Sequence, residues 1–152
     1  MSLRNATGCT ILVVVGAAAS GTESLVLTLK QHTASSGGTS ANLATCDHWY
    51  IKAATTLAGT EQWLRVSQSA SQTITVSDSL TTTGSATSLS SVATKQAIIA
   101  IEVGADQLSD TYAYVSLDVA DPGSASRLGT VLYILHDLNV QRRATSLAAS
   151  LA

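Results

Sequence analysis

Hydrophobic and polar residues alternate along much of the chain, and this alternation predicts β-strands. In the segment 112–119 every odd-numbered residue is apolar, whereas the even-numbered residues are tyrosine, serine and aspartate. Successive side chains of a strand point to opposite faces of a sheet. We therefore expect a strand here with one face in the core, in which Leu117 is buried while Tyr112 and Tyr114 face away.

A second strand is expected at Gly129–Leu135, which is apolar at nearly every position. Strands with this composition are usually covered on both faces by other parts of the protein. The intervening segment Asp121–Ser126 contains Pro122 and Gly123, which favour a reversal of the chain. The pattern therefore predicts that the two strands form an antiparallel pair in the middle of a sheet.

The same patterns predict the remaining elements. The further strands expected in chain order are Thr10–Ala18, Ser24–His32, Asp47–Ala53, Trp63–Gln68, Thr73–Val76 and Lys95–Val103. The polar stretches Thr33–Asn42 and Ser77–Ser91 are expected to be loops, and Gly104–Asp110 to make a single helical turn. About eight strands joined by loops rich in Gly, Ser and Thr predict an all-β fold. We expect an antiparallel two-sheet sandwich, jelly-roll-like in its arrangement.

Both ends of the chain are expected to lie outside the sandwich. The expected boundaries are 1–8 for an N-terminal arm, 9–140 for a single β-sandwich domain and 141–152 for a C-terminal arm. Neither arm has a pattern strong enough to fold by itself, although Leu147 and Leu151 would share one side of a short helix. We expect neighbouring proteins to order both arms, with Arg142 and Arg143 pairing with acidic groups there.

The apolar run that follows Arg4 is similar to the hydrophobic region of a signal peptide. The run is far too short to span a bilayer, and its residues fit a buried strand better. Secretion stays open as a minor alternative, and we expect no membrane among the partners.

Charged residues are scarce, and this limits the kinds of molecule that the protein can bind. They make up 12% of the 152 residues, and the net charge is −2, whereas typical soluble domains contain about 25% charged residues. Nucleic-acid binding requires a basic face, which this composition does not supply. Because the centres of protein interfaces are depleted in charge, the composition favours contacts with other proteins.

The sequence contains none of the short motifs that mark nucleotide binding, zinc proteases or serine hydrolases. We therefore expect no enzyme activity, no catalytic residues and no cofactor. Two His–Asp neighbours, Asp47 with His48 and His136 with Asp137, would form a metal site only if the fold brought them together. We expect no metal site.

The two cysteines, Cys9 and Cys46, do not form a redox or zinc motif. We expect them to be buried thiols that act as small hydrophobic side chains. A disulfide between them stays open, because it depends on whether their strands are neighbours.

Tyr112 and Tyr114 are the candidate contact residues of the domain itself. Two exposed tyrosines on one face are suited to stacking against a sugar or to anchoring a protein contact. Burial of both rings under a long loop is an equally good interpretation of the pattern.

Several short segments are similar to those of a known class of protein. They are Gly129–Leu135 with the preceding Asp118–Gly123, Gly21–Leu25 near the start, and Ala105–Leu108. In these segments the chain resembles small virion proteins of tailed bacteriophages, and most closely capsid decoration, or cement, proteins.

The resemblance implies a β-sandwich or jelly roll that is commonly a homotrimer, sits on the outer surface of the head and stabilises the capsid lattice. The partners would be the major capsid protein and further copies of the chain, and the location would be the virion. The strand Gly129–Leu135, apolar on both faces, would serve the core and a subunit interface together. Two alternatives stay open, namely a tail, collar or fibre component of the same particle and a carbohydrate-binding sandwich.

Overall fold

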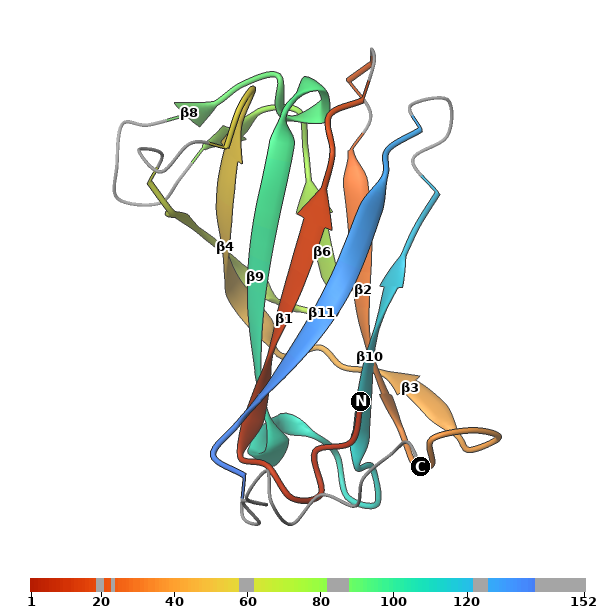
Figure 1. Ribbon diagram of the computed structural model, residues 1–152. Helices are drawn as coiled ribbons and strands as arrows, with labels where there is room; N and C mark the ends of the chain where they lie inside the picture. The colour runs from red at the N-terminus through yellow and green to blue at the C-terminus, as the bar shows by residue number, and fades with distance from the viewer. Residues whose placement is uncertain (19–20, 23, 58–61, 82–87, 122–125, 139–152) are drawn as a thin grey trace, which may run out of the picture.

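The computed structural model describes residues 1–18, 21–22, 24–57, 62–81, 88–121 and 126–138 of the chain. In these residues the protein is a sandwich of two antiparallel β-sheets (Figure 1). The all-β fold predicted from the sequence is therefore confirmed.

The larger sheet has five strands in the order β11-β1-β9-β4-β5. Their bounds are β1 (Gly8–Val15), β4 (Cys46–Ala54), β5 (Leu64–Ser71), β9 (Gln96–Gly104) and β11 (Gly129–His136). The smaller sheet has the order β10-β2-β3, and a fourth strand, β6, also pairs with β2. Its bounds are β2 (Leu25–His32), β3 (Ser40–Asn42), β6 (Thr73–Val76) and β10 (Tyr114–Val119).

Short elements complete the described fold. Strands β7 (Leu80–Thr81) and β8 (Ser88–Leu89) form a small hairpin, and two 3-10 turns are η1 (Val92–Thr94) and η2 (Ala105–Gln107). The chain crosses between the two sheets several times, for example from β1 to β2 and from β9 to β10. The jelly-roll arrangement of these strands stays a prediction. Strands β3, β7 and β8 lie in stretches that the sequence predicted to be loops, because strands of two or three residues are too short to show alternation.

The prediction that the last two strands form a central hairpin is wrong. β10 pairs with β2 in the smaller sheet, and β11 pairs with β1 at the edge of the larger one. β11 is apolar at nearly every position, but it is not covered on both faces as the sequence predicted. Its odd-numbered side chains pack against the core, while the side chains of Leu132 and Ile134 point outward and are 51% and 49% exposed.

The core lies between the sheets and consists of aliphatic side chains from both. The side chains with no solvent-exposed surface include Ile11, Ile51, Ile99 and Ile101 of the larger sheet and Leu27, Leu29 and Ile74 of the smaller. Trp49 is also buried, and its indole N–H donates to the side-chain oxygen of Gln68 at 3.3 Å. The amide group of Gln68 donates in turn to the carbonyl oxygens of Cys46 and Thr73, and so joins the two sheets.

The N-terminal segment, predicted to be an arm, packs against the sandwich. The amide of Leu3 donates to the carbonyl oxygen of Ala113 at 2.8 Å, and the amide of Val115 donates to that of Met1 at 2.9 Å. The Leu3 side chain is buried in the core. The domain itself thus holds this segment, while contact with other subunits stays a prediction. The C-terminal arm, with Arg142, Arg143, Leu147 and Leu151, lies outside the described residues.

Arg127 ties together one end of the sandwich. Its guanidinium donates from Nε to the carbonyl oxygen of Gly16 at 2.9 Å, and from one terminal nitrogen to those of Val92 and Lys95 at 3.2 and 2.8 Å. These acceptors belong to the chain after β1, to η1 and to the residue before β9. Partial burial lowers the pKa of the Arg127 guanidinium. No motif in the sequence had marked this residue.

The core assignment can be tested with two truncations. We expect Ile99→Ala to lower the free energy of unfolding by about 2–5 kcal/mol, because it leaves a cavity at a fully buried site. Leu117→Ala should lower it by less, since Leu117, which the alternation predicted to be buried, is only partly buried near the edge of the smaller sheet. Urea denaturation of both variants measures the difference. Equal losses would show that the two side chains are buried to the same extent.

Candidate interaction surfaces

The outer face of the larger sheet is apolar at its centre. In the strand register Leu132, Leu12, Ala100 and Tyr50 lie side by side across β11, β1, β9 and β4. These side chains point away from the core, because their neighbours along each strand are the buried ones. Four adjacent strands therefore present a continuous apolar row on the outside of the protein.

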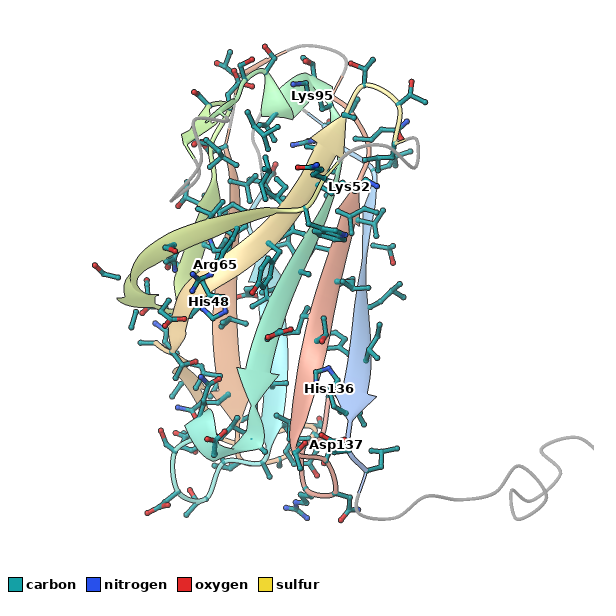
Figure 2. The ribbon with its side chains drawn as sticks, turned by 90° about the vertical axis from the view of Figure 1, so that its left-hand side faces the viewer. His48, Lys52, Arg65, Lys95, His136 and Asp137 are labelled. Carbon is teal, nitrogen blue, oxygen red and sulfur yellow. The ribbon has the colours of Figure 1, made fainter. Side chains whose placement is uncertain are left out.

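Two further rows flank this one and bring polar groups toward its margins. One contains Thr130, Val14, Ile98 and Lys52, and the other contains Ile134, Thr10 and Glu102. Figure 2 looks onto this face and shows Lys52, Arg65 and His48 on the side of β4 and β5. An apolar centre with a polar rim is the usual anatomy of a protein interface. We call this face, defined by the three rows, the outer apolar face.

Most of the exposed hydrophobic side chains belong to β10 and β11 or to the residues that flank them. Of the seven large hydrophobic side chains that are exposed among the described residues, five lie in these strands or within two residues of them. They are Val119, Leu128, Leu132, Ile134 and Leu138. A cavity of about 280 Å³ opens in the same region and is lined by Val13, Leu25, Val119 and Val131 among others. The side of the sandwich formed by β10 and β11 therefore exposes more apolar surface than the rest of the described protein, which is typical of a contact surface.

The outer face of the smaller sheet is polar. Lys30 of β2 forms an ion pair with Asp118 of β10. One ring nitrogen of His32 is 2.7 Å from the Ser40 hydroxyl, and the other is 2.7 Å from that of Ser116. These contacts link β3, β2 and β10 across their outer side, so the two outer faces of the protein differ in chemistry.

The His32–Ser116 contact has the distance of a nucleophile with its base, but the surrounding groups do not complete a hydrolase site. A hydroxyl, that of Ser40, occupies the place where a carboxylate would orient the imidazole. The amide of Leu117, the residue after the serine, donates to the Tyr133 hydroxyl at 3.0 Å and is not available to an oxyanion. The arrangement is suited to fixing the strands, and we assign it no chemistry.

The two predicted contact tyrosines are not placed as a matched pair. Tyr114 of β10 is half-buried, and the Arg4 guanidinium lies 5.4 Å from the centre of its ring. Tyr114 lines a groove of about 380 Å³ with Met1, His32 and Ser116 among others. Tyr112 precedes the strand in a turn, where its amide donates to the carbonyl oxygen of Ser109, and it does not line this groove.

The two His–Asp neighbours stay apart in the fold. His48 lies on β4 and His136 on β11, with β9 and β1 between them (Figure 2). Three strand spacings amount to about 14 Å, which is too far for two ligands of one metal ion. His48 is paired with Asp47 at 2.5 Å, which lowers the pKa of that carboxyl, and His136 contacts the Thr10 hydroxyl at 2.6 Å. Within the described residues, no three potential metal ligands come together.

Cys9 and Cys46 are free thiols, and both are buried. Their strands, β1 and β4, are separated by β9, so the condition for a disulfide between them is not met. Burial raises the pKa of the Cys9 thiol. Burial, together with the adjacent Asp47 carboxylate, raises the pKa of the Cys46 thiol to about 11.

These thiols should be unreactive in the folded protein. With a pKa raised to about 11, the thiolate form of Cys46 is about one part in a thousand at pH 8. We expect a thiol reagent at pH 8 to label neither cysteine in the native protein and both after denaturation. Raising the pH toward the raised pKa increases the thiolate fraction, so labelling should accelerate only at strongly alkaline pH. Rapid native labelling at pH 8 would contradict the burial of these side chains.

No protein-family model, curated protein or solved structure matches the chain. Along the described part of the chain, no helix has the length and hydrophobicity needed to cross a membrane. Sequence patterns had not singled out the outer apolar face. The signal that could have found it is the apolar character of both sides of the strands around Leu12 and Ile98.

Proposed function

We propose that the protein is a structural component of a tailed-bacteriophage virion, and in particular a decoration protein that binds the outer surface of the head. The proposal rests on the sequence resemblance and on one structural observation, the outer apolar face. A rigid sandwich with an apolar centre and a polar rim on one face is well suited to contact another protein. In this proposal, the outer apolar face binds the major capsid protein and stabilises the capsid lattice.

The composition supports a role in assembly. A protein with 12% charged residues brings few groups that must be desolvated when its surface is covered. The polar outer face, with its ion pair and histidine network, would remain in contact with water on the outside of the particle. The resemblance implies a homotrimer, which the single chain does not test. The open edge of strand β11, described below, favours a dimer instead, and the mass of the protein in solution decides between the two.

Binding to capsids tests the proposed function. We expect the purified protein to sediment with heads that lack it and to raise the temperature at which those heads break. Ile98→Lys places a charge on the outer apolar face and should weaken binding by at least about tenfold, or about 1.4 kcal/mol. Its matched control is Val26→Lys, which changes a partly buried aliphatic residue on the opposite outer face.

The outcomes of this experiment are distinct. Failure of the unmodified protein to bind heads would contradict the decoration role, and imaging that located the chain on a tail, collar or fibre would favour those placements. Binding that survives Ile98→Lys but is lost in Val26→Lys would assign the contact to the polar face instead.

Carbohydrate binding is a second candidate, and the groove beside Tyr114 is the observation that favours it. The groove combines an aromatic ring with hydroxyl and imidazole groups, as sugar sites often do. If this function is correct, a glycan array should show binding that Tyr114→Ala abolishes and Tyr112→Ala leaves intact, because only Tyr114 lines the groove. An array without any signal would remove this candidate.

A further inference from the structure

Strand β11 has an open edge. It ends the order of the larger sheet, so the described residues provide a partner strand on one side only. The amide of Gly16 donates to the carbonyl oxygen of Leu128 at 2.7 Å, which fixes the hydrogen-bonding register with β1. In this antiparallel register, the backbone groups of Val131, Tyr133 and Leu135 point away from β1. Three residues in alternation therefore offer backbone donors and acceptors to an added strand.

Two other edge strands, β10 and β5, carry features that protect their edges, and β11 lacks such features. The chain segment Met1–Leu3 runs along the free side of β10, and the Tyr133 hydroxyl accepts from the next available amide, that of Leu117. β5 carries Arg65 and pairs with β4 through an irregular register. Natural proteins use such covers, charges and irregularities to prevent unwanted strand pairing. β11 has a regular register and no Lys, Arg, Asp or Glu between Gly129 and His136.

We propose that β11 of a second copy of this chain adds antiparallel to the open edge, with the two-fold axis at Tyr133. In this pairing the two Tyr133 residues lie opposite each other, and Val131 of each copy lies opposite Leu135 of the other. The backbone N–H and C=O groups of Val131, Tyr133 and Leu135 in one copy thus form hydrogen bonds with those of the other copy. On the outer face, Leu132 of each copy lies opposite Ile134 of the other, and Thr130 of each copy lies opposite His136 of the other.

A second copy fits this edge because the strand is complementary to itself. Every apolar outward side chain meets an apolar one, and no two like charges are brought together. Directly opposed side chains of an antiparallel pair are in contact, so the pairing covers Leu132 and Ile134, which are about half exposed in the single chain. Two sheets of five strands become one sheet of ten, and the outer apolar faces of both copies become continuous.

The mass of the purified protein in solution tests this contact. Light scattering should give the mass of two chains for the unmodified protein at micromolar concentration. Leu132→Lys and Ile134→Lys should each give the mass of one chain, because a charge then faces an apolar side chain at the centre of the contact. Thr75→Lys adds the same charge to an exposed position of β6 and should leave two chains.

A double variant tests the register itself. In L132E/I134K, the new carboxylate of each copy faces the new ammonium of the other only if position 132 lies opposite position 134. We expect the double variant to recover the mass of two chains. Pairing in which like positions face each other would oppose like charges, so a double variant that stays monomeric would overturn the axis at Tyr133.

Amide exchange gives an independent readout in the full chain. The amides of Val131, Tyr133 and Leu135 should exchange at least about ten times more slowly in the unmodified protein than in Leu132→Lys. Protection that persists in a single-chain form would show that the chain covers its own edge, for example with residues 139–152, and would overturn the proposal. A mass of one or three chains for the unmodified protein would also overturn it. The test does not depend on the proposed function, because it needs no capsid.

Discussion

The burial of one aliphatic face of each sheet against the other is the interaction on which the rest of the structure depends. Ile11, Ile51 and Ile99 from the larger sheet meet Leu27 and Leu29 from the smaller, and all of them are removed from water. Because side chains alternate along a strand, burying one set fixes the direction of the other. The outer apolar face is thus a consequence of core packing, since the residues between the buried ones must face outward.

The edges of the two sheets are not equally covered. Which edges are covered depends on where the N-terminal segment and the polar side chains lie. Met1–Leu3 covers the edge of β10, and the Tyr133 hydroxyl accepts a hydrogen bond from the Leu117 amide on the same edge. The remaining backbone groups of β11 point outward beside the exposed Leu132 and Ile134. Hydrogen-bonding capacity and hydrophobic surface therefore coincide at one edge, and the two together favour the addition of a strand.

The two proposals concern different parts of one surface. Pairing through β11 would join two copies by their edges and leave the outer apolar faces side by side, open to a larger partner. A capsid contact through that doubled face would bury more apolar area than a single chain can offer, and linking two sites raises the apparent affinity without new kinds of contact. In both proposals the polar outer face, with Lys30, Asp118 and His32, would stay in contact with water.

The sequence by itself determined the fold class and most strands. Alternation placed β2, β6 and β9 within one or two residues of their observed bounds, because a half-buried strand must show period two wherever it lies. The buried state expected for Cys9 and Cys46 also agrees with the structure. The sequence predicted that Tyr114 faces away from the core. It could not predict the contact of its ring with the Arg4 guanidinium, because Arg4 lies in a distant part of the chain.

Only the tertiary structure decided which strands are neighbours. A local pattern cannot distinguish a strand buried on both faces from one with an exposed apolar face, so β11 was placed at the centre of a sheet although it forms an edge. The row of Leu132, Leu12, Ala100 and Tyr50 joins residues up to 120 positions apart in the numbering of the chain. Such a surface depends on strand order and register, and these are set by long-range packing that no short stretch of sequence contains.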